Sequence, residues 1–422
     1  MLDIDLIRKN PQFVKENLAK RLCEISIDEV VKSDLEWKKS KELEDSLRKK
    51  RNDLTEEIKN AKMQKKPAER LVDEAKQVAD KIIVAGEKTK EMAEKRNYLI
   101  ERLPNLIDNS VPEGPEENFK IVKEWGKKPS FDFKPKQHHE LGQSLGILDM
   151  PRAAKIAGAG FYMFRGPLAR LEWALINYFR DSHFKNGFEE ICPPFLVNSQ
   201  TAFGTGNLPK FEKDLYKTID GFYLIPTAEV PVTNIYANEV LEESELPKRF
   251  YAYTPCYRTE AGRHGSETPG FFRLHQFDKV EMVFLSKPED SWKMHEEMLS
   301  FGEKLIEGLG LHYRTKMLAA GDCGIASAKT YDLEVYAPGM DKYLETSSIS
   351  NCTDFQARRM NTKYKTKEGS KLIHTLNGSG LATPRLMIAL METCQTKEGN
   401  IKVPEVLQKY MNGLKEIAPV KK

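Results

Sequence analysis

The sequence predicts an α+β protein in which an N-terminal antiparallel helical hairpin precedes an antiparallel β-sheet flanked by helices. Residues 27–103 are rich in charged residues, alanine and leucine and almost free of glycine and proline, as long helices require. From about Phe119 onward, β-branched and aromatic runs mix with helical patterns, and long strand pairs outnumber strand–helix alternations. A turn-forming segment at 103–115 separates the two regions. We therefore expect a helical domain at 1–104, with its hairpin at about 27–103, and a sheet-based domain at 105–422.

Length and charge limit the class of protein. A chain of 422 residues has room for two or three domains and a large hydrophobic core. Its 66 basic and 63 acidic side chains give a formal net charge of +3, so the overall charge does not identify a partner. The charged fraction of 31% nevertheless exceeds the roughly 25% of ordinary domains, which indicates a long exposed helical segment.

The cysteines and the apolar stretches exclude several other classes. The six cysteines lie far apart, without a C-x-x-C pair or a histidine at metal-ligand spacing, which argues against a disulfide framework and against structural zinc. We expect isolated buried thiols in a reducing compartment. The first residues lack the basic start and apolar core of a secretory signal, and no stretch approaches the ~18 apolar residues of a membrane span. The sequence predicts a soluble, cytoplasmic protein with no membrane partner.

Within the hairpin, the second half carries a heptad seam whose members alternate in steps of four and three residues. The seam residues are Leu71, Ala75, Val78, Ile82, Ala85, Thr89, Met92, Arg96, Leu99 and Leu103, interrupted only at Thr89 and Arg96. A looser seam in the first half runs through Val30, Trp37, Leu47, Leu54, Ile58 and Ala61, and Pro67 marks the break between the helices. A helix of about 36 residues would extend ~55 Å, so we expect the hairpin to project.

Two interpretations of this hairpin remain open. It could be a dimerising or spacer coiled coil whose charges only solvate it. Alternatively, its basic tip could contact nucleic-acid phosphates, and salt-dependent binding would then be its mark. The tip carries Lys59, Lys62, Lys65, Lys66, Arg70 and Lys76 against only Glu69, Asp73 and Glu74.

The second region contains the expected strands and helices of the sheet domain. Strands are predicted at 122–125, 188–191, 221–225, 250–257, 271–285, 331–336 and 371–376, and helices at 168–184, 291–309, 355–360 and 384–395.

The densest group of chemically capable residues lies between Tyr257 and Phe284. Two strand-like runs joined by a polar, glycine-rich loop bring together Arg258, Arg273 and Glu281 with several aromatic residues. Guanidinium groups can bridge phosphate oxygens, an aromatic face can stack on a base, and a buried carboxylate can hold an ammonium or hydroxyl group. By residue type alone, a surface hairpin with paired charges explains the segment better than a binding site does.

The order of these residues, however, resembles motif 2 of the class II aminoacyl-tRNA synthetases, in the form found in the seryl-tRNA synthetase family. Four further segments are similar to parts of that family. Residues 224–231 (Leu-Ile-Pro-Thr-Ala-Glu-Val-Pro) resemble its serine-pocket strand, 332–359 its metal and nucleotide segment, 376–385 its motif 3, and 171–194 its motif 1. Motif 3 implies a glycine turn running into a helix that bears Arg385, and motif 1 implies a homodimer. The helical hairpin resembles the family's tRNA-binding arm.

This resemblance implies a class II catalytic core and an ATP-dependent ligase that activates L-serine and transfers it to tRNA(Ser), and to tRNA(Sec) where the host has one. Because the serine carboxylate must attack the α-phosphate in line, phosphoryl charge has to be neutralised and the reactants aligned. Arg258 and Arg385 are the implied catalytic residues: Arg258 would hold the α-phosphate and the serine carboxylate, and Arg385 with Arg273 the γ-phosphate.

The resemblance also implies the remaining site residues. The implied ATP site comprises Arg258, Thr259, Glu260, Arg273, Leu274, Phe277, Glu345, Thr346, Ser347, Ser348 and Arg385, with Glu260 at the adenine amino group and Phe277 and Arg385 on either side of the ring. Glu345 and Ser348 are the implied Mg²⁺ ligands, an oxygen set suited to a hard cation. The implied serine site comprises Thr227, Ala228, Glu229, Arg258, Glu281, Asn377 and Ser379. A pocket that hydrogen-bonds the serine hydroxyl would disfavour alanine by roughly 10⁴-fold or more.

Two alternatives remain at this point. A synthetase-like ligase could charge a carrier protein with a small amino acid, although relatives of that type lack the long arm. A non-catalytic tRNA-binding or scaffold paralogue is the other alternative, and it should have lost a charged group at Arg258, Glu281, Glu345 or Arg385, all of which are present.

Overall fold

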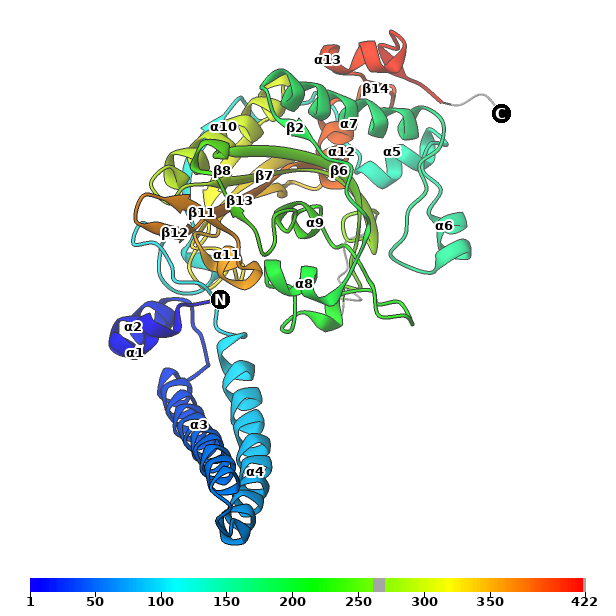
Figure 1. The fold of residues 1–422 in the computed structure, drawn as a ribbon. Coiled ribbons are helices and arrows are strands. Elements are labelled where there is room, and N and C mark those ends of the chain that lie inside the picture. Colours follow the sequence, from blue (N-terminus) through cyan, green and yellow to red (C-terminus); the bar gives the residue numbers. More distant parts are fainter. Residues whose placement is uncertain (261–269, 420–422) are drawn as a thin grey trace. The chain divides into compact units, whose positions relative to one another are not determined.

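The computed structural model describes residues 1–260 and 270–419, and these residues form two compact units (Figure 1). One unit comprises residues 1–19 and 23–103, and the other comprises 20–22 and 104–422.

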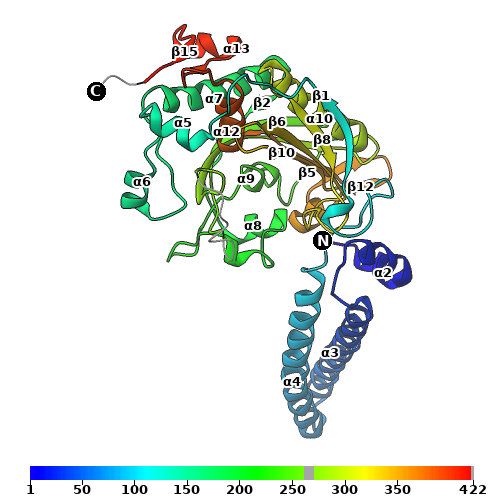
Figure 2. The ribbon, with the colours of Figure 1, turned by 180° about the vertical axis from the view of Figure 1, so that it is seen from behind.

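The first unit is helical. It consists of α1 (Ile4–Lys9), α2 (Pro11–Lys20), α3 (Ile27–Met63) and α4 (Glu69–Ile100). Helices α3 and α4 lie side by side (Figures 1 and 2), and their cross-contacts run antiparallel. Ser40 Oγ lies 3.0 Å from Thr89 Oγ1, and the Lys50 ammonium lies 2.7 Å from the Glu74 carboxylate nearer the tip. The predicted antiparallel hairpin with a break around Pro67 is confirmed.

The heptad seam forms the buried face of the hairpin. Val78, Ile82 and Ala85 are buried, and Leu54 of α3 packs against the first two. Both interruptions of the seam have polar partners, as buried polar groups require. Thr89 Oγ1 donates a hydrogen bond to the Ala85 carbonyl at 2.9 Å as well as contacting Ser40.

The second interruption belongs to a buried ion-pair network. Arg96 Nε donates to Asp34 Oδ1 at 2.7 Å, and Arg8 Nε of α1 donates to Asp34 Oδ2 at 2.7 Å. Burial of Asp34 would raise its pKa, but the hydrogen bonds from Arg8 and Arg96 outweigh burial and hold the pKa below its ordinary value. A carboxylate on α3 thereby joins three helices of this unit.

The second unit contains an eight-stranded sheet in the order β1-β8-β9-β10-β13-β7-β6-β2. Its strands are β1 (Lys120–Trp125), β2 (Glu189–Glu190), β6 (Lys248–Tyr257), β7 (Gln276–Ser286), β8 (Tyr313–Met317), β9 (Lys329–Ala337), β10 (Lys342–Asn351) and β13 (His374–Ala382). Every neighbouring pair is antiparallel except β2 and β6. The predicted antiparallel sheet is confirmed.

Shorter strands and the helices surround this sheet. The shorter strands are β3 (Leu196–Val197), β4 (Tyr223–Leu224), β5 (Val240–Leu241), β11 (Lys363–Thr366), β12 (Gly369–Leu372), β14 (Ile401–Lys402) and β15 (Glu416–Ile417). The helices are α5 (His138–Ser144), α6 (Met150–Ala157), α7 (Pro167–Lys185), α8 (Ser199–Thr205), α9 (Glu229–Thr233), α10 (Ser291–Gly308), α11 (Phe355–Met360), α12 (Thr383–Thr393) and α13 (Glu405–Gln408).

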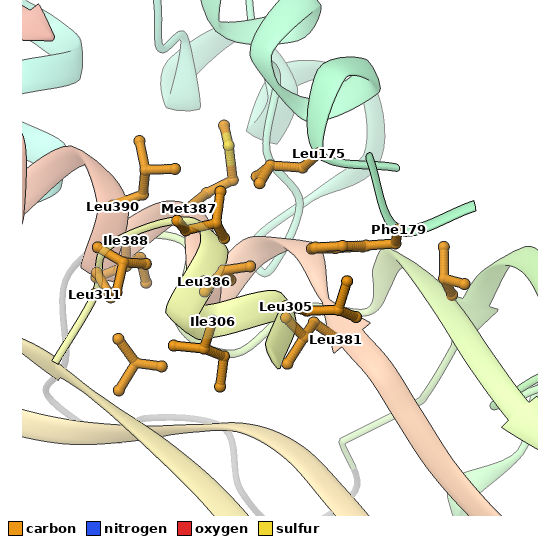
Figure 3. Close-up of a cluster of buried hydrophobic side chains, with 14 of the residues drawn as sticks. Leu175, Phe179, Leu305, Ile306, Leu311, Leu381, Leu386, Met387, Ile388 and Leu390 are labelled. Carbon is orange, nitrogen blue, oxygen red and sulfur yellow. The ribbon is translucent and has the colours of Figure 1, made fainter. Parts of the chain in front are cut away.

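The two faces of the sheet pack against different helices. Helices α7, α10 and α12 cover one face, and α8, α9 and α11 lie on the other (Figures 1 and 2). Side chains of α7, α10 and α12 converge in the larger core, where Phe179 and Leu386 are fully buried (Figure 3). Strand β7 shows the alternation between the faces: Met282 and Phe284 enter this core, whereas Val283 enters the smaller core under α9 and α11.

Several local predictions are wrong. The strand expected at 271–285 begins only at Gln276, because residues 270–275 form bends. The strand expected at 371–376 is divided between β12 and β13. Gly378 and Gly380, expected in a turn, lie within β13, where Gly378 pairs with Met282 of β7, and α12 follows directly. Cys192, expected to be buried, is exposed. Among the described residues, no helix is long and apolar enough to cross a membrane.

Candidate active site

A cavity of about 250 Å³ opens on the face of the sheet that carries the smaller core. It is lined by Thr227, Glu229, Arg258, Glu260, Phe272, Arg273, Leu274, Phe277, Lys279, Glu281, Glu345, Thr346, Ser347, Ser348, Ser350, Asn377, Ser379, Ala382, Pro384 and Arg385. Strand alternation explains its floor, because Phe277, Lys279 and Glu281 are every second residue of β7. In the next strand, Ser379 pairs with Glu281.

Two predicted residues do not line this cavity. Ala228 is fully buried and packs in the smaller core, so its side chain is structural. Thr259 directs its hydroxyl to the Lys213 carbonyl, to which it donates a hydrogen bond at 2.7 Å. All the other residues predicted for the serine and ATP sites line the cavity. The binding role of each remains a prediction.

One end of the cavity contains a buried ion pair. The Lys279 ammonium is paired with Glu281 Oε2 and donates a hydrogen bond to Thr227 Oγ1 at 2.9 Å. Lys279 is 5% exposed and Glu281 is 1% exposed. Asn377 Nδ2 donates to Glu281 Oε1 at 3.4 Å. Charge, hydroxyl and amide groups therefore converge at one end of the cavity, in an arrangement that can recognise a small polar ligand.

Glu229 lies at the same end of the cavity. Gln356 Nε2 donates to its Oε1 at 2.7 Å, and Gln356 is itself held by a hydrogen bond from Thr375 Oγ1 at 2.7 Å. Burial, and then the nearby Glu281 carboxylate, raise the pKa of Glu229 to about 7. Two carboxyl groups thus face the same small volume, and a cationic ligand group placed there would stabilise both as carboxylates.

Three arginines, Arg258, Arg273 and Arg385, line another part of the cavity. The Arg258 guanidinium lies 5.1 Å from the centre of the Phe277 ring, and the Arg385 guanidinium lies 5.0 Å from the centre of the Phe272 ring. Arg273 Nη1 lies 3.8 Å from Glu260 Oε2. A guanidinium group that stacks its face on a ring can still direct the N–H groups of its edge toward phosphate oxygens.

The oxygen-bearing side of the cavity comes from β10. A bulge at Thr346 places one extra residue in the strand, between Glu345 and Ser347. Arg385 Nη1 lies 3.1 Å from Glu345 Oε2 and donates to the Glu345 carbonyl at 3.1 Å. Ser347 Oγ donates to the Ser379 carbonyl at 2.6 Å and Thr346 Oγ1 to the Leu333 carbonyl at 3.0 Å, so these two hydroxyls have protein partners.

Glu345 and Ser348 bring carboxylate and hydroxyl oxygens to this side of the cavity. Asp332 of β9 pairs with Ser348 across the strands, and its buried Oδ1 has no hydrogen-bond partner among the described residues. Burial, and then the charge of Glu345, raise the pKa of Asp332 well above its ordinary value. The charge of Glu334 also raises this pKa and that of Lys316 lowers it, so acidic groups outnumber the lysine around Asp332, an environment suited to a hard divalent cation.

Sequence reasoning missed several cavity residues. Lys279 is the most important of them, and its signal was available, because it lies two residues before Glu281 in a predicted strand and must share its face. Phe272, which stacks on Arg385, gave no such signal because its segment is not a strand. Ser350, Ala382 and Pro384 complete the lining.

The predicted basic tip lies in the first unit, at the turn between α3 and α4. All six of its basic residues, Lys59, Lys62, Lys65, Lys66, Arg70 and Lys76, are exposed. Lys76 Nζ lies 3.7 Å from Asp73 Oδ1. A hollow at the tip is lined by Lys62, Lys66 and Lys76 together with Glu69 and Asp73.

Comparison with known proteins gives matches over both units. Residues 1–107 match the family described as the seryl-tRNA synthetase N-terminal domain, and residues 210–394 match the class II tRNA synthetase core domain (G, H, P, S and T). The chain is 45% identical over 422 residues to the serine–tRNA ligase of Syntrophobacter fumaroxidans, covering 99% of this chain and 100% of that one.

Solved structures give the same result. The seryl-tRNA synthetase from Pyrococcus horikoshii complexed with ATP superposes with a TM-score of 0.90 at 37% identity, covering 100% of both chains. The cytoplasmic serine–tRNA ligase from Naegleria fowleri in complex with AMP superposes with a TM-score of 0.86 at 30% identity, covering 100% of this chain and 99% of that one.

Proposed function

The chain belongs to the seryl-tRNA synthetase family of class II aminoacyl-tRNA synthetases, and from this premise we propose how its cavity is divided between the substrates. It catalyses serine–tRNA ligation: L-serine is activated with ATP to seryl-adenylate and pyrophosphate, and serine is then transferred to the 3′-hydroxyl of the terminal adenosine of tRNA(Ser). The full-length similarity favours this reaction over a carrier-protein ligase or a non-catalytic paralogue. Charging of tRNA(Sec) stays a prediction.

Serine binds at the end of the cavity that contains Glu229, Glu281 and Thr227. Its ammonium group meets two carboxyl groups there, and its hydroxyl competes for the hydrogen bonds of the Lys279–Glu281–Thr227 cluster. Asn377 and Ser379 complete the pocket. Alanine leaves these buried polar groups without a partner, which is the physical basis for its exclusion.

ATP occupies the part of the cavity that the arginines line. Arg258 stacks on Phe277 and its charge also acts on Glu229, so it can bind the serine carboxylate and the α-phosphate together, which aligns nucleophile and phosphorus. Arg385 and Arg273 bind the γ-phosphate. Glu260 accepts a hydrogen bond from the adenine amino group, and Phe277 stacks on the adenine ring. The reaction needs no protein nucleophile, because positioning and neutralisation of phosphoryl charge supply the catalysis.

Glu345 and Ser348 are the proposed ligands of a Mg²⁺ ion that enters with ATP. The exposed carboxylate, the serine hydroxyl and the excess acidic charge around Asp332 fit such an ion. When bound, the ion neutralises charge on the phosphate oxygens. Arg385 pairs with Glu345, so binding of ATP with its cation would have to redirect both side chains toward the phosphates.

The observation that carries this proposal is the convergence, in one cavity, of the Lys279–Glu281–Thr227 cluster with three arginines and an oxygen donor set. ATP–pyrophosphate exchange with serine, threonine, alanine and glycine tests it. We expect exchange with serine alone among the four at millimolar concentrations. Glu281→Ala should nearly abolish serine-dependent exchange. Normal exchange by that variant would show that Glu281 does not bind serine.

We propose that residues 1–104 form the tRNA-binding arm and residues 105–422 the catalytic domain. The exposed basic tip supports phosphate contact, since each neutralised phosphate contributes to a salt-dependent affinity. Replacing Lys62, Lys65, Lys66 and Arg70 with glutamine should leave serine-dependent exchange unchanged. The KM for tRNA(Ser) should rise, and its dependence on salt should weaken. Substitution of exposed Lys38, Lys39, Lys49 and Lys50 on α3 is the matched control.

We also propose a homodimer, which the motif 1 resemblance implies. Helix α7 keeps Trp173 and Phe184 exposed although its other face is buried in the core. Apolar groups of this size on one helix face suit a protein interface. Light scattering at assay concentration tests this, and a mass near the 48.3 kDa of one chain would contradict it.

A further inference from the structure

A buried carboxyl group on the opposite side of β7 from the cavity joins three elements. Glu172 of α7 is 9% exposed. Its Oε1 accepts a hydrogen bond from the Tyr162 hydroxyl at 3.1 Å and lies 3.1 Å from Thr383 Oγ1, in the first residue of α12. Thr383 Oγ1 also donates to the Asp278 carbonyl of β7 at 3.0 Å. Helix α7, strand β7 and the start of α12 therefore meet at this carboxyl group.

The hydrogen count at this junction favours a neutral Glu172. A threonine hydroxyl has one hydrogen, so Thr383 cannot donate fully to both the Asp278 carbonyl and Glu172 Oε1. If Glu172 carries its proton on Oε1, that hydroxyl donates to Thr383 Oγ1 and accepts from the Tyr162 hydroxyl, while Thr383 Oγ1 donates to the Asp278 carbonyl. Every group in that chain then has a partner, whereas the ionised form leaves two acceptors competing for one hydrogen.

The electrostatic surroundings agree with this count. Burial, and then the charge of Asp278, raise the pKa of Glu172 to about 7. The titratable groups that face it are Tyr162 from the preceding loop, Asp278 from β7 and Tyr253 from β6, whose hydroxyl donates to Asp278 Oδ1 at 2.8 Å. Burial raises the pKa of Asp278 as well. None of these three groups is a cation, so none of them stabilises an ionised Glu172.

The junction lies directly behind the ATP end of the cavity. Phe277 and Lys279 line the cavity, and Asp278 between them points to the other face of β7. Thr383 precedes Arg385 by two residues in the first turn of α12. Strand β13 reaches that turn through a bulge in which Leu381 has a φ of +92°, a strained value for a leucine. Regular strand geometry therefore does not fix where α12 begins, and tertiary contacts must do so.

We propose that Glu172 is a positioning residue for ATP: its carboxyl group fixes the first turn of α12 against β7 and so holds Arg385 over the cavity. The inference rests on the proposed assignment of Arg385 to the ATP phosphates. The neutral carboxyl group of Glu172 completes the chain of hydrogen bonds, whereas ionisation of Glu172 weakens the contact with Thr383. Glu172 touches neither substrate, so its loss should affect ATP more than serine.

Steady-state ATP–pyrophosphate exchange on the full chain tests this with four variants. Glu172→Gln keeps a donor and an acceptor and should remain within about twofold of the wild type in KM for ATP. Glu172→Met removes both, and Thr383→Val removes the hydroxyl at constant volume. Each should raise the KM for ATP by about tenfold, the loss of roughly one buried hydrogen bond, with little change in the KM for serine. Thr383→Ser should restore the wild-type value.

Glu303 offers a matched control. It is 8% exposed and accepts a hydrogen bond from Thr315 Oγ1 at 2.8 Å, but it lies on α10 and does not line the cavity. Glu303→Met should lower the melting temperature without an ATP-selective change in KM. If Glu172→Met does not fold, Thr383→Val decides the question by itself.

The pH dependence supplies a second readout. At subsaturating ATP, wild-type exchange should fall as the pH rises above about 7, and Glu172→Gln should lose that part of the dependence. Glu229 titrates in the same range in both proteins, so the difference between the two profiles is the measured quantity. An unchanged ATP KM in Glu172→Met and Thr383→Val, or equal rises for ATP and serine, would overturn the inference. Absence of serine-dependent exchange in the wild type would instead overturn the proposed function.

Discussion

Replacing Lys279 with methionine should damage serine recognition more than any other function of the molecule. Lys279 is the cationic member of the buried cluster at the end of the cavity that we propose to bind serine. Methionine has a similar length and no charge, so the substitution removes the ammonium group without opening a large void. Glu281, which is 1% exposed, would keep only the hydrogen bond from Asn377 Nδ2 at 3.4 Å among the described protein contacts.

The expected magnitude follows from that burial. Removing one partner of a buried ion pair costs about 3–5 kcal/mol, because the remaining charge is left without compensation. The Glu281 carboxylate already raises the pKa of Glu229, so without Lys279 two carboxyl groups would share the same volume with less compensating charge. If the cost falls on the serine site, kcat/KM for serine should drop about 10²–10³-fold, at 1.4 kcal/mol for each factor of ten.

ATP–pyrophosphate exchange against serine concentration measures this effect. The control is Lys329→Met, which removes a lysine that is 12% exposed in its side chain and lies 3.5 Å from Glu296, outside the cavity. We expect Lys329→Met to keep the wild-type kcat/KM for serine. A wild-type value in Lys279→Met would refute the reasoning, and so would a loss that is matched by the control or that falls equally on ATP and serine.

Three further predictions concern the cation, the core and the arm. Glu345→Gln should raise the Mg²⁺ concentration needed for half-maximal exchange by about tenfold, which a Mg²⁺ titration at fixed ATP measures; an unchanged midpoint would exclude Glu345 as a ligand. Burial lowers the pKa of His183 to about 3. Between about pH 6.5 and 3 the unfolded chain therefore binds a proton at His183 that the folded chain does not bind, so the free energy of unfolding should fall as the pH drops through this range. Urea unfolding of His183→Leu should show a shallower acid dependence than the wild type, and identical slopes would contradict this. The pKa of Asp34 is lowered, so its stabilising effect is present above its ordinary value and is lost as the pH falls through the lowered one. Asp34→Asn, which weakens the pairing with Arg8 and Arg96, should unfold the helical unit at lower denaturant concentration, read by circular dichroism at 222 nm, and an unchanged midpoint would mean that the network contributes nothing.

The hairpin could be predicted almost completely from the sequence. Its heptad spacing specifies which face of each helix is buried, and Pro67 marks the turn. The strands of the sheet were predicted less well. Strand propensity cannot show that residues 270–275 bend before β7 begins, or that Gly378 and Gly380 lie within a strand. Both depend on pairing partners distant in the chain.

In the candidate site, too, some features could be predicted from the sequence and others depended on the tertiary structure. The motif order identified the arginines and carboxylates that line the cavity, but residue order does not say where a side chain points. Ala228 lies within a matching motif and yet packs in the core, and Thr259 bonds to the Lys213 carbonyl. Lys279 was missed although its alternation with Glu281 placed it on the same face.

The sequence by itself determined the hairpin, the sheet-based class and most of the charged residues that line the cavity, because periodicity and motif spacing are local properties of the chain. Only the tertiary structure decided which of these groups contact one another. Glu172 and Thr383 are 211 residues apart, and Thr227 and Lys279 are 52 apart. Their contacts exist because the register of β7 between β6 and β13 sets one row of side chains toward the cavity and the next toward α7. A shift of one residue in that register would exchange the two rows, and no local pattern records which partner strand enforces it.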